Sequence, residues 1–455
     1  MGRTFRQGSN NCRCFMKIKF STVVLFFFAS AVFGSGVGYS KLYLFHVALV
    51  IFVFSFLCCF VQNGRQSTII KPKSHFISFL YFMFFWYALG ILWSVEPLYT
   101  LRYLFYIAVG ISIAFIVSAY AVTRQRYLSL YSVLKYCFLL AIAIAFLESF
   151  TSFRLPTSPY SEYAKLFGRD ATNFSEIDYS VHELIRSVPT SFWGNPNNFS
   201  VAMTLVAPFF LFHRNYLMKI IGMLSILLLI VMAGSRGAFL ALVFGFFVFL
   251  FIKGWSYFLS ALVVLFLSFS LFVNSIEVLK QSEYKRVAEL AWTGDAAYSY
   301  LFEQEESTNS IGARQQLIQN GLNALWSSGG IGVGGGGSQY VQERLGGVAG
   351  KFTSMHNFWV EILVDAGFVF FSFFMVWYFS LSYNLYKVYK KSFDNFYRYQ
   401  AGSLFVAMMT FLVSAVSASS VIYLLPMWLM IGMAIALNGL SKKEIYDENR
   451  IACSE

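Results

Sequence analysis

Apolar runs of about 20 residues recur from one end of the chain to the other, and they restrict its fold more than any other feature. A helix of about 20 apolar residues crosses roughly 30 Å of hydrocarbon, where every backbone polar group needs an internal partner. Only 12% of the residues are charged, about half the share found in soluble domains. A transmembrane β-barrel would show short segments of alternating hydrophobicity instead. The sequence therefore predicts an all-α, polytopic membrane protein.

Two long polar segments divide these runs, and all other connections are short. We expect about twelve transmembrane helices, at 20–38, 42–61, 75–94, 102–121, 131–150, 196–213, 217–233, 236–252, 256–274, 357–384, 401–419 and 421–440. The expected order is a cytoplasmic N-terminus (1–19), spans one to five (20–150), an extracytoplasmic loop (151–195), spans six to nine (196–274), a large and partly helical extracytoplasmic loop (275–356), spans ten to twelve (357–440) and a cytoplasmic tail (441–455).

Lysine and arginine gather in alternate connections, which indicates the orientation of the spans because cytoplasmic loops carry the positive excess. With the N-terminus inside, the inner segments hold Arg3, Arg6, Arg13, Lys17, Lys19, Arg65, Lys71, Lys73, Arg124, Arg126, Arg214, Lys219, Lys253, Lys387, Lys390, Lys391, Arg398, Lys442, Lys443 and Arg450. The net charge of +12 is then a topology signal, and no nucleic-acid partner is expected. Both long loops, the turn at 234–237 and the start of the tenth span lie on the outer side.

Arg236 stands in a glycine-flanked turn between two very apolar segments on this outer side. It is either an interfacial arginine whose head reaches the lipid headgroups or an anion-binding residue, since guanidinium stays charged and binds phosphate bidentately.

The large loop contains an amphipathic segment, "SIGARQQLIQNGLNAL" at 310–325, with Arg314 in its first turn. The glycine-rich stretch "SSGGIGVGGGGSQY" (327–340) follows it. Exposed backbone N–H groups at Gly334 and Gly335 would let a phosphate or sugar approach closely. The alternative is a flexible linker.

The first long loop mixes charged residues without a recognisable catalytic spacing and ends in "SFWGNPNNFS" (191–200). Trp193 and Asn197 are candidate sugar contacts, or an interfacial anchor and ordinary turn chemistry. The charged residues concerned are Arg154, Lys165, Arg169, Asp170, Asp178, His182 and Arg186.

The tenth span begins with "SMHNFWVEILVDAG" (354–367), in which Asn357, Glu361 and Asp365 share one helical face. Such groups should face a wet cavity or pair inside the bundle, so we expect the two acids to be structural. His356 lies at the water boundary, where a pKa near neutrality suits it to accept a proton from a hydroxyl. A catalytic Glu361 or Asp365 is the weaker alternative because of its depth.

These residues resemble the motifs of the bacterial O-antigen ligase and polymerase superfamily. Arg236 to Leu240 is similar to its R-x3-L motif, and His356-Asn357 followed by nine residues and Gly367 is similar to H-[NSQ]-x9-G. The segment from Arg314 through the glycine-rich stretch resembles the loop between them, and the likeness is best over about 190–370. The chain departs from the family pattern at Phe370, where a second glycine is usual, and at 327–328, where a proline is common.

The resemblance implies a GT-C-like membrane glycosyltransferase on the outer face of the bacterial cytoplasmic membrane. The donor would be a glycan on undecaprenyl diphosphate. The acceptor would be a sugar hydroxyl, on another lipid-linked repeat for a polymerase or on lipid A core for a ligase, and we favour the polymerase slightly. Inverting chemistry without metal or cofactor is implied, with the lipid bilayer and a chain-length regulator as further partners.

In that scheme Arg236 and Arg314 stabilise the departing diphosphate, and His356 deprotonates or orients the acceptor. Expected substrate contacts are Asn357, Gly334, Gly335, Trp193 and Asn197. Two other classes remain. A transporter of lipid-linked oligosaccharide would carry polar groups through the midplane. A scaffold or receptor would leave the two arginines and the histidine without a shared purpose.

Overall fold

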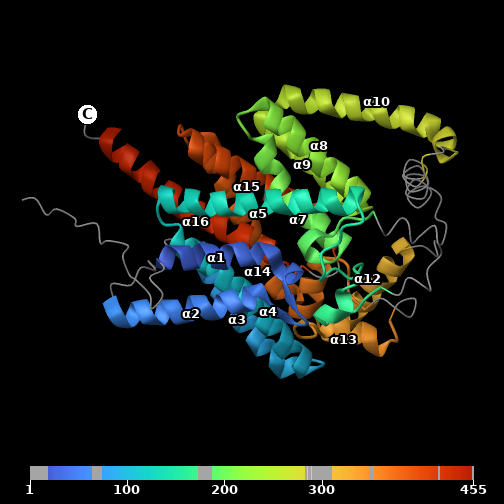
Figure 1. Cartoon of the computed structure of the whole chain (residues 1–455), viewed down its shortest axis with the longest axis horizontal. Helices are drawn as coiled ribbons and strands as arrows, with labels where there is room; N and C mark the ends of the chain where they lie inside the picture. Colours follow the sequence, from blue (N-terminus) through green and yellow to red (C-terminus); the bar gives the residue numbers. More distant parts are fainter. Residues whose placement is uncertain are drawn as a thin grey trace, which may run out of the picture.

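The protein is a bundle of helices in its computed structural model, which describes residues 19–63, 74–172, 187–281, 284, 288, 310–347, 353–418 and 421–452 (Figure 1). Predicted features elsewhere, including Asp178, His182 and Arg186, lie outside the described residues. A helix occupies each predicted span: α1 (Phe20–Phe33), α2 (Leu44–Asn63), α3 (Phe76–Leu89), α4 (Pro97–Tyr120), α5 (Arg124–Phe150), α7 (Pro196–Leu211), α8 (Tyr216–Met232), α9 (Arg236–Lys253), α10 (Trp255–Lys280), α14 (Phe358–Lys391), α15 (Asn395–Ser414) and α16 (Leu425–Ala452).

The connections contain little regular structure. The large loop forms α12 (Ser310–Ser327) and α13 (Gly337–Arg344), which confirms that it is partly helical. The 3-10 turns are η1 (Gly34–Gly36), η2 (Gly90–Trp93), η3 (Ala164–Phe167) and η5 (Ser191–Trp193). A two-stranded antiparallel hairpin joins β1 (Gly38–Tyr39) to β2 (Leu42–Tyr43).

Within the described residues, seven helices are long and apolar enough to cross a membrane: α2, α3, α4, α5, α9, α14 and α16. The shorter apolar helices begin at Phe20, Tyr216 and Trp255. The chain is therefore an all-α, multi-pass membrane protein, and the number of twelve spans stays a prediction.

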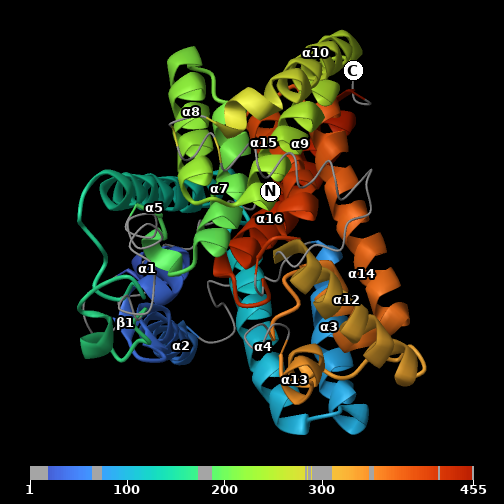
Figure 2. The ribbon, with the colours of Figure 1, turned by 90° about the vertical axis from the view of Figure 1, so that its right-hand side faces the viewer.

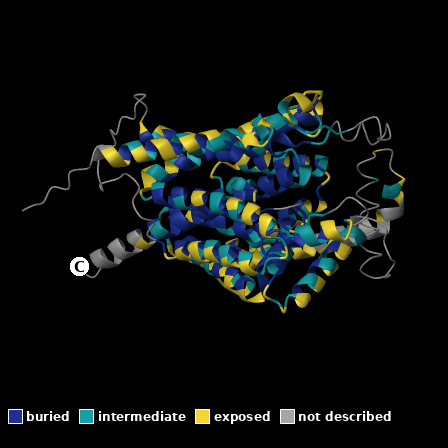
Figure 3. Ribbon diagram, turned by 90° about the horizontal axis from the view of Figure 1, so that it is seen from below, coloured by how far each residue is buried: buried dark blue, intermediate teal, exposed yellow. Residues whose placement is uncertain are grey.

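Close packing holds the centre of the bundle around α16. Gly432 on α16 leaves room for Val117 of α4, since a Cβ there would come within 2.7 Å of it. Gly110 on α4 likewise leaves room for the indole of Trp428, one of the largest fully buried side chains. Small residues let helix backbones approach closely in membranes, where apolar burial alone gives no drive to associate. Buried residues fill the interior and exposed ones cover the outer faces (Figure 3).

Helices α12 and α13 of the large loop and the C-terminal end of α16 lie at opposite ends of the molecule. Figure 1 shows α12 and α13 at one end of the long axis and the end of α16 toward the other. Viewed from the α12 end, α12 and α13 lie over α3, α4 and α14 (Figure 2). The two ends are separated as the predicted topology requires, and which end is extracytoplasmic stays a prediction.

Two single-cysteine variants test the orientation. Leu345 follows α13, which contacts the beginning of α14, and Phe393 follows the far end of α14; the two side chains are 61% and 89% exposed. In a background lacking the 6 native cysteines, an impermeant maleimide should label Leu345→Cys in intact cells and Phe393→Cys only after permeabilisation. The cysteine-free parent is the control. Labelling of both variants from the same side would contradict the topology.

Candidate functional site

Helix α14 is interrupted near its start, at Gly367. This residue has φ 82° and ψ 171°, a conformation that L side chains rarely adopt, and it separates Phe358–Ala366 from the longer segment that ends at Lys391. The segment after Gly367 is roughly 36 Å long, enough to cross a bilayer alone. The predicted span at 357–384 therefore contains a break at Gly367, which the sequence did not indicate. The first segment is a short helix of its own on the side of α12 and α13.

The break frees backbone groups that need partners in an apolar environment. The glycine-rich stretch and Trp86 of α3 supply them. The bonds run from Val333 N–H to Val364 O (3.0 Å), from Gly334 N–H to Asp365 O (3.0 Å), from Trp86 Nε1–H to Ala366 O (2.9 Å) and from Phe368 N–H to Gly330 O (3.0 Å).

Asp365 ties the same stretch to the helix through its side chain. The buried carboxylate accepts the N–H of Gly336 (2.7 Å) and of Ser338 (2.9 Å) at the N-terminus of α13. A negative charge is stabilised there by the free N–H groups and the helix dipole. Asp365 is thus structural, as expected, but its partners are backbone amides rather than cations.

Glu361, one turn earlier, is also held by protein. It is 4% exposed and accepts the phenol O–H of Tyr103 on α4 at 2.9 Å. The two acids therefore join the short helix to α4 and α13, which leaves His356 as the candidate base in this segment.

The glycine-rich stretch is tightly packed. This packing argues against a flexible linker and against open access of a ligand to the backbone of the stretch. Gly334 is buried against Ser94 and Thr100, and a side chain at Gly335 would come within 3.0 Å of the ring of Tyr87. Contact between these two glycines and substrate stays a prediction, and the structure gives them a packing role.

The short helix begins where α15 ends. Phe358 N–H donates to Ala415 O at 3.1 Å, and the indole of Trp359 donates to Leu412 O at 2.8 Å. Helix α9 begins at the same place, because a Cβ on Gly237 would lie 2.5 Å from Cβ of Ser417. The end of α15 thus holds the starts of α9 and α14 together, and with them Arg236 and His356.

Helix α12 brings in the third predicted residue. Gly321 on α12 faces Met355 and Val364, where a Cβ would come within 2.5 Å of the methionine methyl. Met355, Val364, Leu325 and Val333 form a small buried core beneath α12. This contact sets α12 beside the segment that precedes α14 and fixes Arg314 near His356.

The three residues predicted to be catalytic are therefore electrostatic neighbours. Arg236 is exposed at the start of α9, while Arg314 and His356 are half-buried. Burial and the repulsion of Arg236 lower the pKa of Arg314. Burial and the repulsion of Arg314 lower the pKa of His356. Such a site favours an anion beside a neutral imidazole.

His356 has the left-handed backbone conformation, with φ 48°. Conformations of this kind cost about 1–3 kcal/mol and persist where the surrounding structure imposes them. Asn357 follows as the N-cap of α14, its Oδ1 accepting the N–H groups of Trp359 (3.2 Å) and Val360 (3.3 Å). Asn357 thus orients the histidine's segment, and its predicted contact with substrate stays a prediction.

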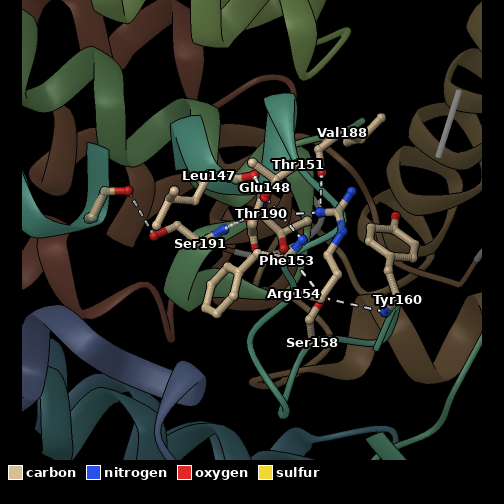
Figure 4. Close-up of polar contacts among 11 residues, drawn as sticks. Leu147, Glu148, Thr151, Phe153, Arg154, Ser158, Tyr160, Val188, Thr190 and Ser191 are labelled. Atoms are coloured by element: carbon tan, nitrogen blue, oxygen red, sulfur yellow. Dashed lines mark hydrogen bonds and ion pairs between the residues drawn. The ribbon is translucent and has the colours of Figure 1, made fainter. Parts of the chain in front are cut away.

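The described parts of the segment between α5 and α7 are held to the end of α5 by a buried ion pair (Figure 4). Glu148 accepts the N–H groups of Thr190 (2.8 Å) and Ser191 (2.7 Å) and lies 3.8 Å from Nη1 of Arg154. Arg154 donates to Val188 O at 2.7 Å. Burial lowers the pKa of Arg154, and Glu148 opposes that shift. This charge cluster joins two parts of the loop and is structural.

Trp193 and Asn197 follow closely in the sequence after Thr190 and Ser191, whose N–H groups Glu148 accepts. Trp193 is 7% exposed, and its rings pack near Phe138, Phe192 and Phe199. Asn197 is half-buried in the first turn of α7. Neither residue is brought to the arginine–histidine site by a described contact, so their role as sugar contacts stays a prediction.

Sequence reasoning missed the residues that assemble the site. Ala415 and Ser417 lie within the predicted apolar span 401–419, and Gly321 sits in an ordinary amphipathic helix. Tyr103 and Trp86 carry polar atoms in apolar runs, which was the available signal, but their partners are far away in the sequence.

Residues 221–375 match the protein-family model described as O-antigen ligase. The matched region is thus similar to the domain that defines the O-antigen ligase family. It contains Arg236, Arg314 and His356, and the match confirms the resemblance drawn from the motifs. The chain is also similar to the teichuronic acid biosynthesis protein TuaE of Bacillus subtilis (strain 168), with 26% identity over 444 residues that cover 93% of this chain and 84% of TuaE. Both matches support a ligase-type or polymerase-type role in polysaccharide biosynthesis. Among the described residues, no group of three or more His, Cys, Asp and Glu side chains is placed to hold a metal ion.

The break in α14 predicts a specific cost of substitution. Gly367→Ala places a Cβ against the backbone of Ile331 and Gly330 in a left-handed conformation, whereas Gly329→Ala, also at positive φ, meets nothing within 4 Å. We expect Gly329→Ala to cost about 1–2 kcal/mol and Gly367→Ala roughly 3 kcal/mol or more. Thermal unfolding in detergent measures both. Equal losses would show that the packing at the break does not matter.

The lowered pKa of His356 predicts a shift in titration. The imidazole is neutral above its pKa and gains a proton as pH falls through it, and that pKa lies below the ordinary 6.5. Arg314→Gln removes the repelling cation and should move the titration to higher pH, while Arg344→Gln on α13 should not. The pH dependence of His356 carbethoxylation, followed by mass spectrometry, measures this. An unchanged midpoint in Arg314→Gln would show that Arg314 does not lower the pKa of His356.

Proposed function

We propose that the chain is a membrane glycosyltransferase that moves a glycan from undecaprenyl diphosphate onto a sugar hydroxyl, and that it acts as a polymerase of lipid-linked repeats. The reaction takes place at the Arg236–Arg314–His356 site on the outer face of the cytoplasmic membrane. The observation that carries this proposal is the meeting of two guanidinium groups and a histidine of lowered pKa at one end of the bundle.

The two arginines act on the leaving group. As the bond between the anomeric carbon and the phosphate oxygen breaks, its electron pair stays on the diphosphate, which gains negative charge. Arg236 and Arg314 repel each other when the site is empty, and a diphosphate between them relieves that repulsion. Fixed cations aimed at a developing charge stabilise the transition state without a metal ion.

His356 acts on the acceptor. The acceptor oxygen attacks the anomeric carbon from the face opposite the diphosphate, which inverts its configuration, and the hydroxyl proton passes to the neutral imidazole. The low pKa of His356 keeps it unprotonated at neutral pH, so it can take this proton. The partial burial of Arg314 and His356 strengthens the interactions that these two side chains make.

A ligase that transfers finished polymer to lipid A core is the alternative. The similarity to a protein named for teichuronic acid biosynthesis supports a role in making the polymer. The lipid-linked glycans of a deletion strain separate the two roles. Single repeats that still reach the final acceptor indicate a polymerase, and complete loss of attached glycan indicates a ligase. Substrate trapped on the cytoplasmic side would instead indicate a transporter.

Single substitutions test the assigned roles. Arg236→Ala, Arg314→Ala and His356→Ala should each lower the rate of polymer formation about 100-fold or more, because each removes a charge or proton acceptor used in the transition state. Arg344→Ala, which loses a cation stacked on Tyr340, is the matched control and should keep normal polymer. Gel analysis of surface glycan, with membrane protein measured by immunoblot, gives the result. Normal polymer from all three site variants would refute the proposal.

A further inference from the structure

A basic cavity lies at the end of the bundle opposite the arginine–histidine site. Its volume is about 590 Å³, within the range of ligand pockets, roughly 300–1,000 Å³. Lys253, which lines it, ends the same helix that Arg236 begins, so the two sites are roughly 25 Å apart along α9. The cations that line the cavity are Arg124, Lys135, Arg214, Lys253 and Arg398.

These charges are poorly balanced. None of the described residues that line the cavity is acidic. Asp394, beside it, pairs with Arg124 at 2.6 Å. Lys253 lies within electrostatic range of Lys219 and Arg398. Clustered cations that repel one another favour binding of an anion.

An apolar cavity of about 390 Å³ adjoins the basic one. It lies between α5, α7, α15 and α16, with Leu139, Leu205, Leu429 and Met430 among its lining residues. The residues that line both cavities are Tyr131, Lys135, His213 and Tyr399. The two spaces therefore adjoin each other at these residues, one lined by cations and the other by apolar side chains.

We propose that these joined cavities bind an anionic phospholipid, with the phosphodiester headgroup in the basic part and an acyl chain in the apolar part. Charge and shape carry the assignment. A free phosphate would use only the basic part, and an apolar molecule only the other part. Basic pockets between membrane helices on the cytoplasmic side bind phosphate headgroups in this way. Arginine favours phosphate because its planar group donates two parallel hydrogen bonds.

The hydroxyl groups at the junction support this placement. Tyr131 and Tyr399 share a hydrogen bond of 2.8 Å, and Tyr399 also donates to Phe209 O at 2.9 Å. Tyr131 and Tyr399 line both cavities, and tyrosines of this kind are common at the headgroup level of a membrane.

The headgroup is tested with the full-length protein in neutral detergent, titrated with phosphatidylglycerol, phosphatidylcholine or inorganic phosphate and followed by native mass spectrometry. The double variant Lys135→Gln/Arg398→Gln should bind phosphatidylglycerol at least tenfold more weakly. Lys387→Gln, a cation of α14 that stacks on Tyr383 outside the cavity, should bind it within twofold of wild type. Equal affinity for phosphatidylcholine, binding of inorganic phosphate as tight as that of phosphatidylglycerol, or unchanged binding by the double variant would each overturn the proposal.

The chain is tested with a pair of neighbouring leucines on α5. Leu139 lines the apolar cavity, whereas Leu140, 47% exposed, does not. Leu139→Trp should fill the cavity and weaken phosphatidylglycerol binding at least tenfold, and Leu140→Trp should leave it within twofold of wild type. Melting without added lipid confirms that both variants fold. Equal binding by the two tryptophan variants would overturn the placement of the acyl chain.

Discussion

The candidate site depends on how the protein satisfies the broken backbone of α14. A glycine at positive φ ends a short helix inside an apolar bundle, and the freed carbonyls would be costly there without partners. The glycine-rich stretch of the large loop supplies N–H groups to two of them, and Asp365 closes the junction by binding the start of α13. These hydrogen bonds therefore connect the glycine-rich stretch of the loop directly to the membrane helices.

That connection explains why residues from three separate segments meet. Helix α12 is held by the packing of Gly321 against Met355, and the starts of α9 and α14 share the end of α15. Arg236, Arg314 and His356 each stand at the start of a helix or just before one. Packing of the helices orients side chains at such positions. The ends of these side chains stay accessible, which suits binding of an anion and an acceptor hydroxyl.

Much of this arrangement could be predicted from the sequence because hydrophobic periodicity and charge placement are local signals. The helix positions follow from such patterns, whereas the roles of Arg236, Arg314 and His356 rest on the family resemblance and stay a prediction. The break at Gly367 could not be predicted, since a lone glycine in an apolar run is compatible with a continuous helix. The burial of Gly334, Gly335 and Trp193 depends on distant residues such as Tyr87 and Phe138, which no local pattern reveals. The pairing of Asp365 with backbone amides rather than with cations could not be predicted for the same reason.

The two ends of the bundle differ in chemistry. One end gathers arginines and a histidine beside a folded loop, and the other gathers cations around a cavity that adjoins an apolar one. A phospholipid held at the second end would fix the packing of α5 against α7 and α15 without touching the first.

Glycosyl transfer by the purified protein tests the central claim most directly. In nanodiscs with a defined repeat unit on undecaprenyl diphosphate, we predict products with two or more repeats on one lipid and one released lipid diphosphate for each bond formed. His356→Ala should give neither. Wild-type protein that binds the lipid-linked repeat yet never lengthens it, or His356→Ala protein that lengthens it at the wild-type rate, would contradict the account.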